Sequence, residues 1–305
     1  MCRGVPHLAR RERDRCAESV PFSPPRCPAP IVSREVVSAD IRGQLVLLGT
    51  GTSVGVPSIG CGCAVCTSTN PKNNRTRCSV ILGLPEGNLL IDTSPDMRQQ
   101  LLREKIGLIH AVLYTHEHAD HLFGLDDLRL MQFYLGGPVP LYCEEWVEQR
   151  IRKSFDYAFV RRPNLHRGAV PALEFKRIGP VNGGWPAIEL LGASITAVRQ
   201  HHGPNFDTLG FRFGNVAYCT DVSAMPEESK ERLQGLDVLI LDALREKGHT
   251  THLSLDQAIS LAEELQPKQT YFTHMAHDLE HEATNARLPA SMQLAYDGLR
   301  IALLS

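Results

Sequence analysis

The sequence has almost no net charge and no long hydrophobic run. Its formal net charge is -2 and its isoelectric point is near 6.7, which argues against a surface that generally coats nucleic acid. No apolar segment reaches the about 20 residues that a membrane-spanning helix needs. The nine cysteines are odd in number, which fits a reducing compartment better than a secreted disulfide scaffold. We therefore expect a cytoplasmic protein without a membrane partner.

The first forty residues lack the features of a targeting signal. Arginine and proline are both frequent there without an apolar segment, and Glu12, Asp14 and Glu18 argue against a transit peptide. Because proline and charge oppose burial, we expect residues 1–40 to be a disordered extension without assigned function. An upstream start codon chosen in error is the alternative. Residues 41–305 are long enough for one α/β domain with a large core.

Short apolar runs alternate with helical patterns beyond residue 40. The runs predict strands over residues 44–50, 78–84, 88–92, 111–115, 194–199, 216–220, 237–244 and 269–273. Helices are expected over residues 125–134 and 144–155, after a Ser94 cap, and after Ser254, which forms a capping box with Gln257. The Arg-, Pro- and Gly-rich segment 161–185 predicts a loop. This alternation of strands and helices by itself predicts only that the fold is of the α/β class.

The segment THEHADH places four metal-competent side chains directly after a predicted buried strand: His116, His118, Asp120 and His121. His116 and His118 point the same way in an extended chain, so both can bind one ion. After the chain turns, Asp120 and His121 can face a second ion. Imidazole and carboxylate suit zinc, manganese or iron, and two adjacent ions suit attack on a phosphoryl or acyl centre. A histidine-rich surface loop is the alternative.

THEHADH resembles the H-x-H-x-D-H signature of the metallo-β-lactamase superfamily, which closes its site with a later histidine, a bridging aspartate and a final histidine, each after a strand. The resemblance implies that these are His202, Asp221 and His274, each of which follows a strand-like run. The adjacent His201 is barely distinguished from His202 by the residues alone. An isolated aspartate after a strand is more often a turn residue than a ligand. Asp221 is therefore a candidate ligand only because the other candidate ligands accompany it.

A second motif, GCGCAVC, presents Cys61, Cys63 and Cys66 as C-x-C-x-x-C. Three thiolates fit three corners of a zinc tetrahedron, and the neighbouring glycines allow the backbone to bend around the ion. The best candidate for the fourth corner is His277, with Cys78, His281 and His110 as weaker candidates. A set of free thiols is the alternative.

These motifs together resemble the H-x-H-x-D-H signature and later ligands of the metallo-β-lactamase superfamily. The added C-x-C-x-x-C motif is similar to one branch, the phosphoribosyl 1,2-cyclic phosphate phosphodiesterases of the carbon–phosphorus lyase pathway. The resemblance runs from about residue 45 to the C-terminus. It implies an αββα sandwich, in which two mixed sheets have helices outside. It also implies a structural Zn²⁺ site made by Cys61, Cys63, Cys66 and His277.

The resemblance implies a phosphodiesterase that hydrolyses a small, cyclic, ribosyl-type phosphodiester. Hydroxide held by two Mn²⁺ or Zn²⁺ ions would attack the phosphorus, and the resemblance favours Mn²⁺ over Zn²⁺. One ion would be held by His116, His118 and His202, and the other by Asp120, His121 and His274. Asp221 would bridge the ions, and His252 would protonate the leaving oxygen. A solvent-facing residue at a helix start is the alternative for His252.

Two weaker expectations concern the surroundings of this site. Asp92 is expected to orient the ligand loop. Arg75 and Arg77 could contact a substrate phosphate, with a solvated surface pair as the equal alternative.

Three rival functions share parts of this pattern. A tRNA 3′-processing nuclease has the same ligand set but normally carries a basic, glycine-rich arm that this sequence lacks. A thioester or β-lactam hydrolase is the second rival. A non-catalytic carrier, as in cofactor-biosynthesis relatives, is the third, although those relatives tend to lose ligands that this chain retains. The expected partner is a small phosphodiester substrate rather than nucleic acid, with a homodimer left open.

Overall fold

The computed structural model describes residues 35–160, 166, 168–181 and 184–303. Nearly all of the predicted N-terminal extension, residues 1–34, therefore lies outside the described residues. The chain divides into two units, Met1–Glu35 and Val36–Ser305. The description below concerns the second unit.

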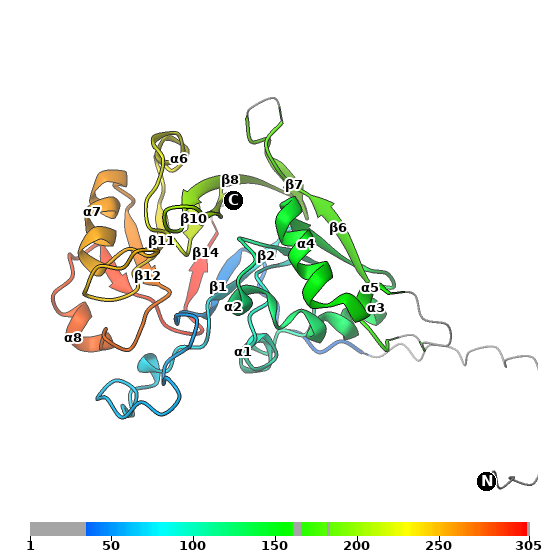
Figure 1. The fold of residues 1–305 in the computed structure, drawn as a ribbon, viewed down its shortest axis with the longest axis horizontal. Coiled ribbons are helices and arrows are strands. Elements are labelled where there is room, and N and C mark those ends of the chain that lie inside the picture. Colours follow the sequence, from blue (N-terminus) through cyan, green and yellow to red (C-terminus); the bar gives the residue numbers. More distant parts are fainter. Residues whose placement is uncertain (1–34, 161–165, 167, 182–183, 304–305) are drawn as a thin grey trace, which may run out of the picture. The chain divides into compact units, whose positions relative to one another are not determined.

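Within the described residues, the strands form two seven-stranded sheets (Figure 1). The first sheet has the order β14 (Arg300–Ala302), β1 (Gln44–Gly49), β2 (Ser79–Leu84), β3 (Gly87–Ile91), β4 (Ala111–Leu113), β5 (Val139–Cys143) and β6 (Leu173–Arg177). The second has the order β13 (Met292–Leu294), β12 (Gln269–Thr273), β11 (Val238–Asp242), β10 (Val216–Cys219), β9 (Asp207–Phe213), β8 (Ala193–His201) and β7 (Ile188–Leu190).

Each sheet has an antiparallel part and a parallel part. In the first sheet β14, β1, β2 and β3 pair antiparallel, whereas β3 to β6 pair parallel. In the second sheet β7 to β10 pair antiparallel and β10 to β13 pair parallel. The carboxyl ends of parallel neighbours lie at one edge, where side chains on the following loops can converge.

Helices cover the outer face of each sheet. The first sheet is covered by α1 (Met97–Glu104), α2 (Ala119–Leu122), η2 (Leu125–Leu130), α3 (Met131–Tyr134), α4 (Glu145–Ser154) and α5 (Asp156–Phe159). The second sheet is covered by α6 (Glu227–Arg232), α7 (Leu255–Leu265) and α8 (His281–Asn285). A short 3-10 helix, η1 (Pro71–Asn73), lies in the cysteine-containing segment.

Alternation along the buried strands explains the layers. On β1, Leu45 and Leu47 enter the core between the sheets, whereas Val46 and Leu48 face the helices. A strand buried on both faces needs apolar residues at every position, so these strands appear in the sequence as continuous hydrophobic runs. The αββα sandwich with two mixed sheets is therefore confirmed.

Three local predictions need correction. The segment predicted as a loop over residues 161–185 contains β6, an edge strand whose side chains are mostly exposed and therefore lack the apolar pattern of a buried strand. Residues 161–165, 167 and 182–183 of this segment lie outside the described residues. The helix predicted over residues 125–134 is divided into η2 and α3. Ser94 accepts a hydrogen bond from the amide of Asp96 in a turn, and α1 begins only at Met97.

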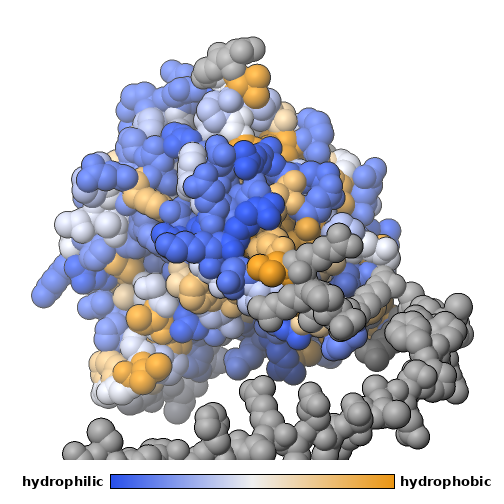
Figure 2. Space-filling model, turned by 45° about the vertical axis from the view of Figure 1, so that its right-hand side comes forward, coloured by the Kyte–Doolittle hydropathy of each residue, from blue (hydrophilic) through white to orange (hydrophobic). Residues whose placement is uncertain are grey.

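Among the described helices, none is long and apolar enough to cross a membrane. The face drawn in Figure 2 carries hydrophilic residues across its middle, with hydrophobic residues in smaller groups around them.

Candidate active site

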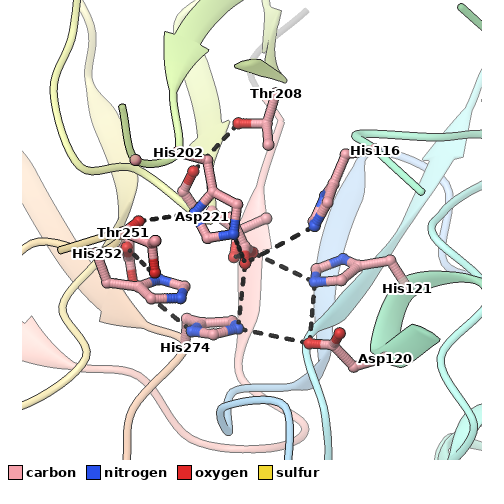
Figure 3. A network of polar contacts seen from close by, with 12 residues as sticks. His116, Asp120, His121, His202, Thr208, Asp221, Thr251, His252 and His274 are labelled. Carbon is pink, nitrogen blue, oxygen red and sulfur yellow. Dashed lines mark hydrogen bonds and ion pairs between the residues drawn. The ribbon is translucent and has the colours of Figure 1, made fainter. Parts of the chain in front are cut away.

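Asp221 lies at the centre of the histidine cluster (Figure 3). Its Oδ1 is 3.4 Å from Nε2 of His274, 3.7 Å from Nε2 of His202 and 3.9 Å from Nε2 of His116. Its Oδ2 is 3.3 Å from Nε2 of His121. The imidazoles of His116, His202 and His274 lie on loops after strands, and that of His121 lies on α2. They come from both sheets, so a single carboxylate connects the two halves of the sandwich.

The candidate ligands form two groups around this carboxylate. His116, His118, His202 and Asp221 present ligand atoms within 4.8 Å of one another, and so do Asp120, His121 and His274. Asp120 Oδ2 lies 3.2 Å from Nε2 of His121 and 3.7 Å from Nε2 of His274. The structure thus brings together all seven residues that the sequence selected, with His202 rather than His201 in the cluster.

Three residues at this site have left-handed backbone conformations. The φ angles are 62° at Asp92, 58° at Asp221 and 58° at His274, each one or two residues after the end of a strand. Such angles are uncommon outside glycine, although Asp and His tolerate them better than most residues. The sharp turn at each strand end redirects the side chain toward the other sheet, and strain of this kind is concentrated at functional sites.

Hydrogen bonds fix the orientation of three imidazoles through Nδ1. His121 Nδ1 donates to Asp92 Oδ2 at 2.7 Å, and His202 Nδ1 donates to the carbonyl of Thr251 at 2.7 Å. The hydroxyl of Thr115 donates to Asp92, so it accepts from Nδ1 of His116 at 2.9 Å. In each ring Nε2 is therefore the nitrogen that faces the cluster and is left to bind a metal ion. Asp92 orients the ligand loop as expected.

His118 is the most exposed of the candidate ligands. Its ring stacks on Phe206, with centroids 4.9 Å apart and planes 8° apart. It also lies edge to face against His116 and His202. Stacking on an aromatic side chain thus supports His118, whereas hydrogen bonds through Nδ1 hold the rings of His116, His121 and His202.

The buried nitrogens of the cluster fit metal ions. Within the described residues, Nε2 of His116, Nε2 of His121 and both nitrogens of His274 are buried and have no hydrogen-bond partner. Burial opposes a charge on His274, yet Asp221 and Asp120 raise its pKa to about 9. Protons on the imidazoles would balance these carboxylates, and a divalent cation can take their place when it binds. The fold family and this donor set both imply divalent metal ions.

His252 lies beside both groups of candidate ligands. Its ring stacks on His274 at 4.6 Å and packs edge to face on His202 at 4.6 Å. Its Nδ1 donates to Asp242 Oδ2 at 3.0 Å. Asp242 also accepts from the amide of Val222, the residue after Asp221. This carboxylate therefore positions His252 and the central loop together, and His252 is buried rather than free in solvent.

Cys61, Cys63 and Cys66 surround Nδ1 of His277. The three Sγ atoms lie 3.2, 3.3 and 3.5 Å from this nitrogen. A zinc tetrahedron with ordinary Zn–S and Zn–N bonds has S···N edges of about 3.5 Å. The amide of Cys66 donates to Cys63 and is the largest factor that lowers the pKa of the Cys63 thiol to about 6. A thiolate at neutral pH suits a zinc ligand.

The weaker candidates for the fourth corner lie elsewhere. Cys78 is buried against the hydroxyl of Thr273, and His110 Nδ1 accepts from the amide of Asn88. His281 begins α8 and lines a separate pocket with Lys72.

The two arginines predicted near a substrate phosphate hold the protein's own loops. Arg75 is 1% exposed and donates to the carbonyls of Ala276 and Leu279. Arg77 donates to the carbonyl of Ser53 and to Asp96. The substrate role of Arg75 is therefore corrected, because its buried guanidinium is occupied by the loop that carries His277. Arg77 is only partly buried but is likewise paired.

Several supporting residues were not identified from the sequence. Asp242 ends β11, so in the sequence it follows an apolar run, as Asp92 and Asp221 do, and this pattern could have identified it. Thr251 contributes a backbone carbonyl, and Phe206 contributes a ring from the turn between β8 and β9. Neither of these two contacts has a sequence signature, because each depends on how distant loops meet.

Comparison with known proteins places the chain in a family. Residues 87–275 match the family model described as a beta-lactamase superfamily domain. A solved diphosphatase of the PhnP family is 48% identical, with a TM-score of 0.77 over 85% of this chain and 96% of that chain.

Two curated relatives carry other names. An octanoyltransferase from Porphyromonas gingivalis is 34% identical over 84% of this chain, which spans about half (51%) of that protein's length. A coenzyme PQQ synthesis protein B from Rhodopseudomonas palustris is 24% identical over 85% of this chain and 99% of that protein. The chain belongs to the metallo-β-lactamase superfamily, in the branch that contains the PhnP-family diphosphatase.

Proposed function

We propose that the protein is a metal-dependent phosphodiesterase that hydrolyses a small, cyclic, ribosyl-type phosphodiester. The observation that carries this proposal is Asp221, whose two oxygens face four imidazoles from two ligand groups. Such an arrangement suits two adjacent cations and hence a substrate with a charged phosphoryl centre.

The residues would divide between the ions as the two groups indicate. His116, His118 and His202 would hold one, Asp120, His121 and His274 would hold the other, and Asp221 would contact both. When bound, the ions would neutralise charge on the phosphoryl oxygens and activate water for attack. Mn²⁺ and Zn²⁺ both suit these donors. The cysteine cluster with His277 would hold a structural Zn²⁺.

His252 supplies the proton for the leaving oxygen in this proposal. Asp242 accepts from Nδ1, so Nε2 is the atom that can deliver a proton. The same carboxylate stabilises the charged imidazole that precedes the transfer. Because His252 stacks on His274, the proton donor stays next to the phosphoryl site. A third grouping, Asp221, His252 and His274, would instead make His252 a metal ligand.

A second candidate is cleavage of a diphosphate. It is favoured by the PhnP-family diphosphatase, which is 48% identical over 96% of its length. A diphosphate also presents a phosphorus whose leaving group is an oxygen anion, so the same residues would serve. Acyl transfer is less well supported, since the octanoyltransferase extends well beyond the matched region.

A panel of substrates tests the proposal on the metal-loaded protein. We expect hydrolysis of bis(p-nitrophenyl) phosphate and of ribose cyclic phosphate to exceed hydrolysis of the corresponding monoesters. A monoester dianion repels the nucleophile and competes as a metal ligand, which a diester monoanion does less. Preference for diphosphates would favour the second candidate. Turnover of monoesters, thioesters or β-lactams without diester cleavage would contradict the proposal, and salt-dependent tRNA binding with tRNA cleavage would favour the nuclease.

A further inference from the structure

His274 is a candidate metal ligand whose ring is not fixed by a hydrogen bond. Within the described residues both of its ring nitrogens are buried without a hydrogen-bond partner, whereas Nδ1 is hydrogen-bonded in His116, His121 and His202. Asp242 Oδ1 approaches Nδ1 of His274 only to 3.8 Å, which is too long for a hydrogen bond. The position of this ligand therefore depends on the backbone that carries it.

The backbone after His274 is held by the cysteine-containing segment, residues 50–77. The amide of Met275 donates to the carbonyl of Thr50 at 2.9 Å. Six residues further on, the amide of His281 donates to the side-chain oxygen of Asn73 at 2.9 Å. In Figure 1 the cysteine-containing segment, drawn in blue to cyan, lies beside α8. Both ends of the loop 275–281 are thus attached to this segment.

Arg75 holds the middle of the same loop. Its guanidinium donates to the carbonyls of Ala276 at 2.9 Å and Leu279 at 2.6 Å, one on each side of His277. In the described part of the chain its acceptors are these carbonyls and the amide oxygen of Asn73, not carboxylates. Burial lowers the pKa of Arg75 to about 10, so the group remains charged at neutral pH. A buried charge needs fixed acceptors in place of water, so Arg75 and the loop keep each other in position.

The backbone of Arg75 is attached to the cysteine cluster. Its amide and carbonyl exchange two hydrogen bonds with Val56, both at 2.8 Å. Val56 packs with Val65 and the three cysteines of the cluster. His277 completes the cluster from the loop that Arg75 holds. A continuous set of contacts therefore runs from the cysteine cluster through Arg75 to the residue next to His274.

We propose that Arg75 is a positioning residue that makes metal binding at the cysteine cluster and metal binding at His274 depend on each other. The inference rests on the metal assignment in the proposed function and goes further, because it gives the cysteine cluster a role in the affinity of the histidine cluster. An ion bound by the thiolates and His277 would fix the loop 275–281, and His274 would then need less ordering to bind its own ion. By linkage, each site raises the affinity of the other by the same factor, which is about 5- to 150-fold in typical cases.

A manganese titration tests this coupling without turnover. Wild-type protein carrying one equivalent of Zn²⁺ on the thiolates is titrated with Mn²⁺, which suits imidazole and carboxylate donors. The electron paramagnetic resonance signal of free Mn²⁺ gives the dissociation constant. Cys63→Ser, titrated without Zn²⁺, should bind Mn²⁺ about tenfold more weakly, within the range of ordinary coupling. His277→Gln provides the same comparison where Cys63→Ser does not fold. Turnover at saturating metal should be unaffected, because the ligands of the histidine cluster are unchanged.

Arg75→Lys tests the route of the coupling. Lysine keeps the charge but lacks the planar fork that binds two carbonyls together, so the Mn²⁺ affinity of the zinc-loaded variant should fall about tenfold. Adding Cys63→Ser should then cause little further loss. Val139→Ala is the control, because Val139 is a buried residue of β5 in the core of the other sheet, and its Mn²⁺ affinity should match that of the wild type.

Four results would overturn the inference. They are an unchanged affinity in Cys63→Ser, additive losses in the double variant, an equal loss in Val139→Ala, and absence of Mn²⁺ binding to the wild type. The comparison of Cys63→Ser with Val139→Ala remains decisive even where Arg75→Lys does not fold.

The inference and the proposed function fail in different ways. If the affinities are coupled but no phosphodiester is cleaved, the proposed function is wrong and the coupling stands. If phosphodiesters are cleaved but Cys63→Ser binds Mn²⁺ as tightly as the wild type, the coupling is wrong and the proposed function stands.

Discussion

At the scale of single residues, His252 differs from its neighbours because it is adjacent to both ligand groups and has a buried carboxylate, Asp242, on its Nδ1. His252→Ala should slow substrates with alkoxide leaving groups by about a hundredfold or more, the usual contribution of a general acid. Nitrophenyl esters should be much less affected, because nitrophenolate departs without a proton. The kcat/KM values for both substrate types measure this difference. An equal loss on both would deny His252 the role of general acid.

Cys63 and Asp120 are expected to separate the two metal sites. Cys63→Ser should remove one zinc equivalent and lower the thermal midpoint, since a structural ion stabilises the folded state. Phosphodiesterase activity per folded molecule should remain. Asp120→Ala should abolish turnover with little effect on the midpoint, because the fold does not depend on this carboxylate. If both variants lose activity while remaining equally stable, the cysteine cluster takes part in catalysis.

At the scale of elements, α7 begins three residues after His252 and depends on its capping box. The hydroxyl of Ser254 accepts from the amide of Gln257, and the Gln257 side chain accepts from the amide of Ser254. Ser254→Ala should lower the free energy of unfolding by about 1 kcal/mol, measured by denaturant titration. Ser260→Ala is the control, because Ser260 is exposed within the same helix. Equal effects of the two substitutions would mean that the cap does not stabilise α7.

His281, the first residue of α8, should make stability depend on pH. Burial, followed by Lys72 and countered by Glu282, lowers the pKa of His281 to about 4. The unfolded state, with its ordinary pKa of about 6.5, then binds the proton more readily than the folded state. The stability contribution is complete above about pH 6.5 and is lost as the pH falls toward 4.

His281→Gln should therefore reduce the loss of stability between pH 6.5 and 4, by at most about 3 kcal/mol. Denaturant titrations of both proteins at several pH values across this window provide the test. Any release of metal by acid affects both proteins alike, so the difference between them isolates His281. If the free energy of unfolding changes with pH equally in both proteins, His281 does not change its protonation on unfolding.

At the scale of the whole molecule, the separate ligand groups should give a total of about three metal ions per chain. Elemental analysis of protein purified without chelator measures this number. Two ions would belong to the groups around Asp221 and one to the cysteine cluster. A content near one, with full phosphodiesterase activity, would exclude the binuclear centre.

The pattern of elements was largely predictable because it is encoded locally. The buried strands β1, β2, β3, β10, β11 and β12 appear as short apolar runs, and the structure places each within a few residues of its predicted bounds. The edge strand β6 was missed because its side chains are mostly exposed, so the apolar signal of a buried strand is absent. Segment 125–134 was predicted as one helix, but the choice between 3-10 and α geometry depends on packing.

The sequence alone determined which residues gather at the strand ends, because short-range spacing after an apolar run fixes where a ligand loop begins. It also determined the cysteine motif and the cap of α7, which involve residues within one or two turns of each other. Only the tertiary structure decided which distant groups meet. Asp242 reaches His252, the carbonyl of Thr251 reaches His202, and Arg199 joins Glu144 to the two tryptophans. These contacts depend on how strands far apart in the chain pair and on how the two sheets pack face to face. No local sequence pattern encodes that arrangement.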